Sequence, residues 1–415
     1  MSPDLPFDII ALVIDIVGAN KNTDLLKELA LVSHSFLQIC SKHLFATVEL
    51  RDYEDVPGRH LSSSKTGFVK LLKSRPDVVR FIRKLTYRVS AAPSPIFQEN
   101  DHLLSSILLH LLPSFSRLNS LAISASRLNW NNLDTSLTSA FLRLMHLPTI
   151  NHIHLSYIDN FPLSSLTTCV NLRLLSIIQL HTLDFPEIVE MMPKIRVFRT
   201  SGSCQLTRKL LHAKRQDGQP AFNFMDLRRI SATLNDFESG DWDIQHLLQN
   251  AELLESFFLY IGQSGSIKGI LSPGARILKV LDLTLMFNFL RDPFLGGICE
   301  ELEALVGHNL LETLSLKVVL FHLVTVDFMG AIFQEVEKVL VKPGWSMLRQ
   351  VSFKISIARF EGSRKLCELL QSLPDKYLSH LSKHKSIAFD YSAFVRTPGL
   401  WRLPKIVHGA TIFTR

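Results

Sequence analysis

Three short stretches of this 415-residue chain carry residue types that could do chemistry. His152 and His154 are two residues apart, so on a strand both imidazoles would lie on one face, a spacing found in metal sites. Asp241 and Asp243 form a carboxylate pair that could act in acid–base catalysis. Residues 262–266 read Gly-Gln-Ser-Gly-Ser, a composition that invites comparison with phosphate loops and nucleophile turns.

Each stretch lacks the partners that such chemistry needs. No acidic residue or cysteine near the two histidines completes a metal-ligand set, since Asp159 lies in the following turn. The two aspartates stand where a helix is expected to begin, and acidic residues there serve as caps. The glycine–serine stretch has neither the Gly-Lys-Ser/Thr ending of a phosphate loop nor the Gly-x-Ser-x-Gly order of a nucleophile elbow. We therefore predict a protein that is not an enzyme and that needs no metal or cofactor.

The number and spacing of the cysteines and the hydropathy of the chain limit the classes of protein to which it can belong. The five cysteines contain no Cys-x-x-Cys pair, which argues against both a disulfide framework and a zinc site; they are Cys40, Cys169, Cys204, Cys299 and Cys367. Hydrophobic residues make up 47% of the chain, which excludes disorder as the main state. No apolar run reaches the roughly 20 residues of a membrane span, and residues 9–19 lack the basic start of a secretion signal. We expect an intracellular protein, in the cytoplasm, the nucleus or both.

The first fifty residues have the apolar spacing of three short helices. Pro6 suits a first helical turn, and the apolar residues that follow repeat at intervals of three and four: Ile9, Ile10, Val13, Ile14 and Val17. Residues 18–20 are expected to end this helix, and Thr23 or Asp24 to cap the second. A third helix is predicted over residues 36–45. Because fifty residues bury only a small core, several apolar side chains are left to face a partner: Leu5, Ile9, Leu25, Val32 and Phe36.

This segment resembles an F-box. The family pattern is Leu-Pro, an acidic residue, two aliphatic residues, Asp-Leu, then Leu-Val-Ser and an aromatic residue. The matching residues are Leu5-Pro6, Asp8, Ile9-Ile10, Asp24-Leu25, Leu31-Val32-Ser33 and Phe36, followed by Leu44-Phe45. Asp8 replaces the commoner Glu, and Phe36 the commoner Trp. The resemblance implies docking on the Skp-type linker protein of a cullin ubiquitin ligase through Leu5, Pro6, Ile9, Ile10, Leu25, Val32 and Phe36. The alternative is an unrelated helical cap with the same periodicity.

The rest of the chain repeats the pattern aliphatic-x-x-aliphatic-x-aliphatic at intervals of 22 to 37 residues. The ten copies are Ile82/Leu85/Tyr87, Leu118/Leu121/Ile123, Ile150/Ile153/Leu155, Leu172/Leu175/Ile177, Ile195/Phe198/Thr200, Leu227/Ile230/Ala232, Leu254/Phe257/Leu259, Leu278/Leu281/Leu283, Leu311/Leu314/Leu316 and Leu348/Val351/Phe353, with a shorter last copy at Ile387/Phe389. Helical patterns between them begin after the expected caps Asp101, Asp134, Asp243 and Asp327. Strands alternating with helices predict parallel strands that stack as a solenoid.

The pattern is similar to a degenerate leucine-rich-repeat array, a frequent companion of an F-box in fungal proteins. That family places Asn or Cys three residues after the last strand aliphatic, and here only Asn235 does so. The predicted fold class is an N-terminal all-α three-helix F-box followed by an α/β leucine-rich-repeat-like solenoid with parallel strands. The predicted domains are an F-box over residues 1–50, a connector over 51–66 and a substrate-binding domain over 67–415. An ordinary open α/β domain is the alternative.

The charge is unevenly divided along the chain. The formal net charge is +7, and residues 1–50 hold three lysines against six acidic residues, so the remainder carries +10. At alternate strand positions, which would line the inner side of a solenoid, basic residues outnumber the single acidic Asp282. The predicted substrate-binding residues are Lys84, Arg88, His154, Arg199, Arg229, Phe258, Tyr260, Lys317 and Lys354. An alternative explanation of these polar residues is that solvated strands favour them without any ligand. Alternatively, the loops at 213–223 and 262–276 recognise the substrate.

The F-box resemblance, together with the repeat pattern, implies a substrate-recognition adaptor of a Skp–cullin–F-box ubiquitin ligase. Its partners would be the linker protein, the cullin complex and a protein substrate, acidic or phosphorylated, with no membrane. The alternative is a repeat scaffold without ubiquitin chemistry that binds an acidic protein or nucleic acid through its basic face. Charge alone gives little support to nucleic acid, because no long Lys/Arg block is present.

Overall fold

The structure is a computed structural model of the chain, in which two compact units can be distinguished. The first contains Met1–Pro193 and Ala213–Ala221, and the second contains Lys194–His212 and Phe222–Arg415. The residues that the structure describes are 6–51, 65–89, 95–181, 188–189, 193–202, 204–215, 217–234, 241–262, 269–271, 277–287, 296–307, 309–320, 326–357, 364–395 and 405–407.

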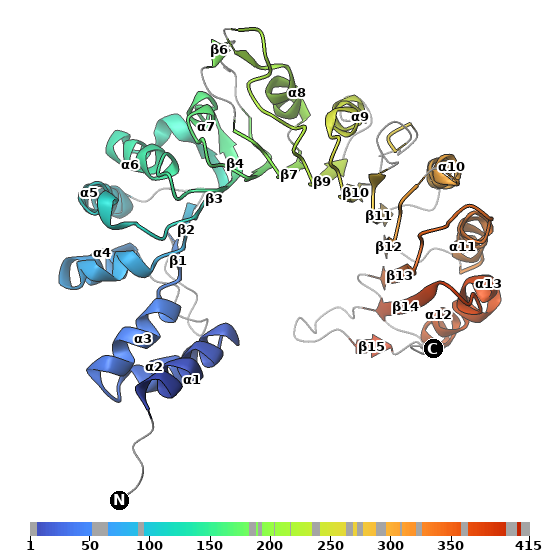
Figure 1. The fold of residues 1–415 in the computed structure, drawn as a ribbon, viewed down its shortest axis with the longest axis horizontal. Helices are drawn as coiled ribbons and strands as arrows, with labels where there is room; N and C mark the ends of the chain where they lie inside the picture. Colours follow the sequence, from blue (N-terminus) through green and yellow to red (C-terminus); the bar gives the residue numbers. More distant parts are fainter. Residues whose placement is uncertain are drawn as a thin grey trace, which may run out of the picture. The chain divides into compact units, whose positions relative to one another are not determined.

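The first unit starts with three helices and continues as strands alternating with helices (Figure 1). Its helices are α1 (Phe7–Ala19), α2 (Thr23–Ala30), α3 (His34–Leu44), α4 (Lys65–Ser74), α5 (Pro95–His110), α6 (Thr135–Met145) and α7 (Ser164–Thr167), with the short 3-10 turns η1 (Pro76–Phe81), η2 (Leu112–Ser114) and η3 (Trp130–Asn132). Its main sheet has the order β1 (Thr47–Arg51), β2 (Lys84–Val89), β3 (Ser120–Asn129), β4 (His152–Asp159) and β5 (Leu174–Ile178), all parallel. A separate parallel pair is formed by β6 (Ile188–Val189) and β8 (Lys214–Arg215).

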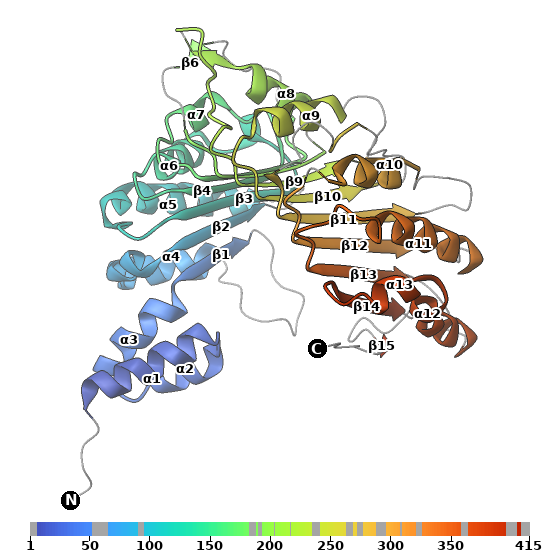
Figure 2. The ribbon, with the colours of Figure 1, turned by 45° about the vertical axis from the view of Figure 1, so that its right-hand side comes forward.

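The second unit repeats the same alternation. Its helices are α8 (Cys204–His212), α9 (Asp241–Asn250), α10 (Gly296–Leu305), α11 (Val326–Leu340), α12 (Arg364–Tyr377) and α13 (Ser379–Ser382). Its strands follow the order β7 (Val197–Ser201), β9 (Arg229–Leu234), β10 (Ser256–Ile261), β11 (Val280–Phe287), β12 (Thr313–Leu320), β13 (Gln350–Ile357), β14 (Ala388–Val395) and β15 (Lys405–Val407). Neighbours pair in parallel from β7 to β14 (Figure 2), and β15 pairs with β14 in the antiparallel direction.

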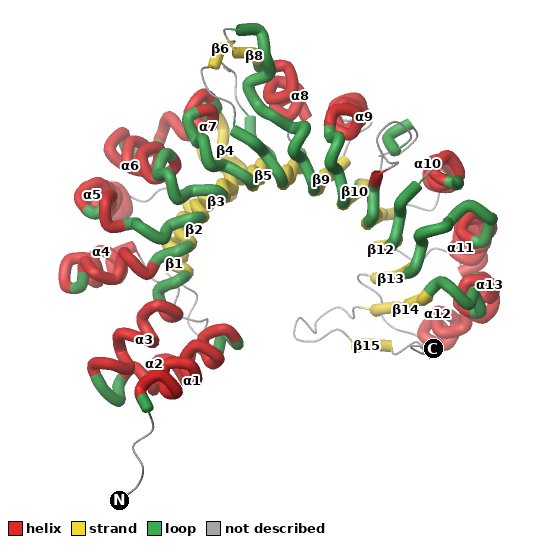
Figure 3. The backbone as a smooth tube through the Cα atoms, viewed as in Figure 1, coloured by secondary structure: helices red, strands yellow, loops and turns green. Residues whose placement is uncertain are grey.

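Within each unit the helices that alternate with the strands, α4–α7 in the first and α8–α13 in the second, lie on one face of the sheet, whereas α1–α3 form a bundle beyond β1 (Figures 1 and 3). All three aliphatic positions of the ten predicted copies are buried, from Ile82, Leu85 and Tyr87 to Leu348, Val351 and Phe353. The residues between them alternate to the opposite face, as strand geometry requires. We call that opposite face, on which no described helix packs, the open face. The predicted α/β fold with parallel strands is therefore confirmed.

Local details differ from the predictions in three places. Thr47–Arg51 forms β1, which pairs with β2, although these residues were expected to end the helical segment. The strand was not predicted because it contains only two buried alternating residues, Val48 and Leu50. Asp101, Asp243 and Asp327 do not precede their helices as caps, because α5, α9 and α11 already begin at Pro95, Asp241 and Val326. The side chain that caps α2 belongs to Asn22, which accepts from the backbone N–H of Leu25 at 3.2 Å, in place of Thr23 or Asp24.

Other predictions were accurate or lie outside the described residues. Asp134 caps α6, accepting from the N–H groups of Ser136 and Leu137 at 2.9 and 3.0 Å. The first helix ends at Ala19 as expected, and the left-handed residue beyond it is Lys21, with φ of 56°. Asn235 and residues 263–266 lie outside the described residues. No described helix has both the length and the apolar content that a bilayer crossing requires.

Candidate functional site

The three N-terminal helices share a very small core. Only Ile14, Leu26 and Cys40, one residue from each helix, are buried at its centre. The partly buried residues packed around this centre are Ile10, Val17, Leu29, Ala30, Phe36, Ile39 and Leu44. The hydroxyl of Ser33 caps α3 by accepting from the N–H of Phe36 at 3.2 Å, which fixes the start of that helix. This core leaves much of the apolar surface of α1 uncovered.

The uncovered side chains form what we call the apolar face. On α1, Ile9, Leu12, Val13 and Ile16 follow the i, i+3, i+4, i+7 spacing of a single helix stripe, and all are exposed. The turn after α2 adds Leu31 and Val32, which are 87% and 65% exposed. Leu25 is also exposed, as is Phe7, which lies at the start of α1 on the side of Ile14. Together these residues make up eight of the fourteen exposed large hydrophobic side chains among the described residues. Such a concentration marks an interaction surface, because soluble proteins rarely expose clustered apolar side chains.

The structure exposes some of the predicted linker-binding residues and partly buries others. Pro6, Ile9, Leu25 and Val32 are exposed, whereas Ile10 and Phe36 are partly buried against the helical core. Leu5 lies outside the described residues. Exposed apolar residues that the sequence analysis did not assign to linker contact are Phe7, Leu12, Val13, Ile16 and Leu31. Val13 was expected on the buried side of α1; it is exposed because α2 and α3 cover only the side that contains Ile14.

A polar clamp holds α1 against α3. The carboxylate of Asp15 accepts from Lys42 Nζ at 2.6 Å and contacts His43 Nε2 at 2.7 Å. Hydrogen bonds from these two partners lower the pKa of Asp15. One turn along α1, Gly18 faces the same imidazole, and a Cβ added there would lie 2.3 Å from His43 Cγ. The clamp therefore depends on the absence of a side chain at Gly18.

We expect Gly18→Ala to destabilise the helical segment by about 1–2 kcal/mol. Alanine would gain up to about 1 kcal/mol of helix propensity, but forcing the held imidazole aside costs about 1–3 kcal/mol. Urea unfolding of the full chain, followed by circular dichroism, measures the difference. In a His43→Ala background the same substitution should cease to destabilise, because the ring that it clashes with is gone. A stabilising effect of Gly18→Ala in the parent chain would contradict this account.

Two arginines on the open face of the first unit share one carboxylate. Arg88 Nε and Arg51 Nε contact Glu49 Oε1 at 2.5 and 3.1 Å, and Glu49 comes from β1, the strand that the sequence analysis missed. His154 Nδ1 lies 2.8 Å from Ser176 Oγ on the neighbouring β5. The described residues contain no group of three or more His, Cys, Asp or Glu side chains that could hold a metal ion. This face therefore resembles a solvated sheet surface.

The open face of the second unit carries the other predicted residues. Lys317 and Lys354 are exposed and directly opposite each other on β12 and β13. Their charges act on Asp282, whose pKa is raised by burial and lowered to a smaller extent by a hydrogen bond from Ser315 and by the two lysines. Arg199 and Arg229 are exposed, while Phe258 and Tyr260 are half-buried. The structure thus places all nine predicted substrate-binding residues on open faces, in two groups that belong to different units.

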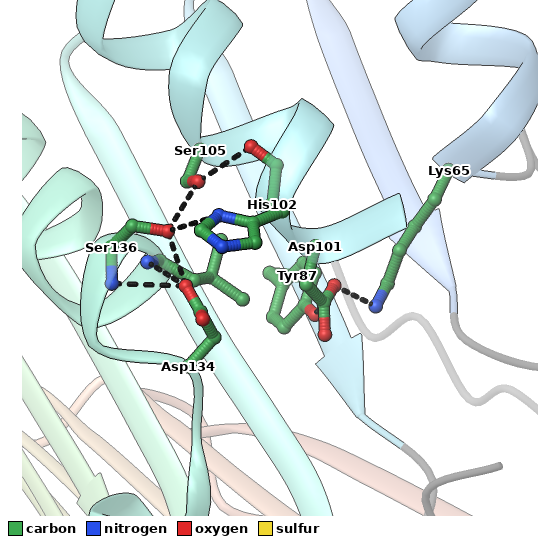
Figure 4. A network of polar contacts seen from close by, with 8 residues as sticks. Lys65, Tyr87, Asp101, His102, Ser105, Asp134 and Ser136 are labelled. Atoms are coloured by element: carbon green, nitrogen blue, oxygen red, sulfur yellow. Dashed lines mark hydrogen bonds and ion pairs between the residues drawn. The ribbon is translucent and has the colours of Figure 1, made fainter. Parts of the chain in front are cut away.

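A buried polar network joins α4, β2 and α5 (Figure 4). Lys65 Nζ donates to Asp101 Oδ1, which also accepts from Tyr87 Oη at 3.1 Å, and Lys65 Nζ lies 4.9 Å from the Tyr87 ring centroid. Burial lowers the pKa of Lys65, while the hydrogen bond from Lys65 to Asp101 opposes this shift. Burial and the Asp101 charge raise the pKa of Tyr87 well above its ordinary value. The network is shielded from solvent, so its role is structural.

A serine, a histidine and an aspartate meet beside this network. Ser136 Oγ lies 3.2 Å from His102 Nδ1 and 2.7 Å from Ser105 Oγ, and it donates to Asp134 (Figure 4). In a nucleophilic triad the carboxylate orients the histidine, and the histidine activates the serine. Here the carboxylate contacts the serine and caps α6, so the arrangement does not have the order that activates a hydroxyl.

Comparison with models of known protein families gives no match for this chain, and no curated protein sequence matches it significantly.

Proposed function

We propose that this protein is a non-catalytic substrate-recognition adaptor of a Skp–cullin–F-box ubiquitin ligase. The observation that carries the proposal is the apolar face of the N-terminal helices, which gathers eight exposed large hydrophobic side chains within residues 7–32. Burying such side chains against a partner contributes roughly 1.5–3 kcal/mol each in transfer terms. A partner protein that covers this face would therefore gain substantial binding free energy.

The choice of partner rests on the F-box resemblance. Ile9, Leu25 and Val32, which the resemblance assigns to linker contact, are exposed and belong to the apolar face. Asp8 and Glu28 on the same helices are exposed acidic residues, whereas Asp24 pairs with Lys27 at 3.2 Å. Basic groups of the partner opposite Asp8 or Glu28 would add electrostatic complementarity. These features favour a Skp-type linker protein as the occupant.

We further infer that the strand–helix units are degenerate leucine-rich repeats stacked as a solenoid. In support, the strand of each strand–helix repeat pairs in register with the strand of the next repeat, as β10, β11, β12 and β13 do. The three aliphatic positions of every copy are also buried. The repeats would hold the substrate on their open face. The adaptor then acts by proximity, because it raises the effective concentration of substrate lysines near the ligase's ubiquitin carrier. Such a ligase subunit would act in the cytoplasm, the nucleus or both.

The direct test mixes the purified full chain with a recombinant Skp-type linker protein. We expect a complex of one copy of each on size-exclusion chromatography. The fluorescence of an apolar dye bound to the free chain should fall when the linker covers the apolar face. Absence of a complex, together with DNA or RNA binding that weakens steeply with salt, would favour the alternative scaffold function.

A further inference from the structure

One region of the open face of the second unit has basic and aromatic side chains and no acidic one. It comprises the outward positions of three neighbouring strands, β7, β9 and β10, which we call the arginine–aromatic patch: Val197, Arg199, Ser201, Arg229, Ser231, Thr233, Ser256, Phe258 and Tyr260. We propose that this patch binds an acidic segment of a partner protein, whose carboxylate or phosphate groups pair with Arg199 and Arg229 while an apolar side chain packs on Phe258 and Tyr260. The identification of that segment as part of the ligase substrate rests on the proposed function.

The first argument is charge. Arg199 and Arg229 are exposed, and no ion pair joins either of them to another described residue. Three of the other predicted open-face cations differ, because Arg88 contacts Glu49, and Lys317 and Lys354 act on Asp282. On β14, a further carboxylate, Asp390, lies 3.4 Å from Ser352 Oγ of β13. The nearest carboxylate in the register is Asp282 of β11, which is the partner of Phe258 in the same row. An anionic group of a ligand therefore meets the least opposing charge at the β7 and β9 side of the arginine–aromatic patch, where Arg199 and Arg229 lie.

The second argument is geometry. Register places Arg199, Ser231 and Phe258 in one row across three strands, with Arg229 one row before Ser231 on the same strand. Neighbouring strands are about 4.8 Å apart, so the row from Arg199 to Phe258 spans roughly 10 Å. An extended segment of three or four residues, at about 3.3 Å each, covers this span. Hydroxyl groups of Ser231 and Thr233 lie among the charged and aromatic groups and can donate further hydrogen bonds.

The third argument separates a peptide from a nucleic acid. The guanidinium carbon of Arg229 lies 5.7 Å from the Phe258 ring centroid, close enough for a cation–π contact. This contact holds the guanidinium in place, which favours bidentate binding of a carboxylate or phosphate. It also covers one face of the ring that an unpaired base would need for stacking. Arginine beside half-buried aromatic rings is the composition of protein-binding hot spots.

Three labelled peptides of about 12 residues test the ligand class by fluorescence anisotropy with the full-length protein. The first alternates glutamate and leucine in a glycine–serine background, the second has glutamine for glutamate, and the third has phosphoserine at two glutamate positions. We expect both acidic peptides to bind at least about tenfold more tightly than the glutamine peptide, with weaker binding as salt increases. Tighter binding of the third peptide than of the first would identify phosphate as the preferred group, and equal binding would identify carboxylate.

Two matched double variants locate the site. Arg199→Gln with Arg229→Gln should weaken binding of the acidic peptides by about tenfold or more. Lys317→Gln with Lys354→Gln removes the same charge from the same face and should change it by less than about twofold. Equal losses in the two variants would overturn the proposal, as would equal binding of the glutamine peptide. Tighter binding of a single-stranded thymidine oligonucleotide than of either acidic peptide would also overturn it, in favour of nucleic acid.

Linker binding serves as the separate readout. Both double variants should still form the complex with the Skp-type linker protein, because neither touches the N-terminal helices. If the peptides bind as expected but no linker complex forms, the patch is supported and the adaptor function fails. If the linker complex forms without any preference for acidic peptides, the adaptor function survives and the patch fails.

Discussion

Replacing Leu12 and Val32 with aspartate is expected to weaken capture of the Skp-type linker protein by more than about a hundredfold. The two side chains are 60% and 65% exposed in the free chain and would be covered in the complex. Loss of their burial removes about 3–6 kcal/mol in total, and each 1.4 kcal/mol corresponds to about tenfold in affinity. The buried carboxylates would add a further desolvation penalty. Titration calorimetry with the purified linker protein measures the change.

The same double variant should leave the fold intact, since surface substitutions usually change the free energy of unfolding by less than about 0.5 kcal/mol. Val170→Asp with Met225→Asp is the matched control, because these apolar residues are 45% and 54% exposed but lie outside the apolar face. The control should bind the linker protein like the parent chain. A complex of unchanged affinity with the Leu12 and Val32 variant would refute the assignment of the apolar face as the docking surface.

Asp101→Ala is expected to lower the free energy of unfolding by about 3–5 kcal/mol, the cost of leaving a buried charge without its partner. Lys65 is only 3% exposed, and its ammonium group donates to the Asp101 carboxylate. Tyr87 would lose its hydrogen bond of 3.1 Å to the same carboxylate. Urea unfolding at neutral pH, followed by circular dichroism, gives the difference in stability.

The loss of stability caused by Asp101→Ala is expected to depend on pH in one direction. Burial already lowers the pKa of Lys65, and removal of Asp101 takes away the group that opposes that shift. Between the lowered pKa and the ordinary lysine value of about 10.4, the unfolded chain binds more protons than the folded chain, so stability rises with pH. The deficit of Asp101→Ala should therefore shrink as pH is raised towards 10. A deficit that grows instead would contradict the buried-charge explanation.

The double variant Lys65→Met with Asp101→Leu provides the control for that explanation. Replacing both partners with apolar side chains removes the charge as well as its counter-ion, so its stability should lie close to that of the parent chain. If the double variant is as unstable as Asp101→Ala, loss of packing rather than an unpaired charge is the cause.

Strands were predicted well because their burial pattern has a short period. Leu281 and Leu283 on β11, for example, alternate with Asp282, and both leucines are buried while Asp282 faces the open side. Each copy repeats this alternation, so its strand could be located without knowledge of its neighbours. β1 was missed because a single five-residue strand after a helix has too few alternating positions to stand out.

The N-terminal helices were harder to interpret. Helix α1 has apolar residues around most of its circumference, so spacing alone could not show that Ile14 is buried while Val13 next to it is exposed. That choice is made by where Leu26 and Cys40 pack. Asp101 shows the same limit: its partner Lys65 is 36 residues away, and only the folded chain brings them together.

The open-face residues were placed correctly, but their electrostatic roles could not be read from spacing. Arg88 and Arg199 both occupy outward positions on their strands. Their difference comes from neighbouring strands, since Glu49 on β1 contacts Arg88 and no described ion pair reaches Arg199. Asp390 on β14 was likewise not counted, because the last copy of the pattern was too short to define its outward positions.

The apolar face also has a consequence for the abundance of this protein in the cell. We expect a chain that exposes Leu31 at 87%, together with Val32 and the α1 stripe, to self-associate and to bind chaperones while it is alone. Overproduction without a covering subunit should therefore yield aggregates or rapid proteolysis. The amount of the covering subunit, rather than the rate at which this chain is made, would then limit the steady-state abundance of this chain.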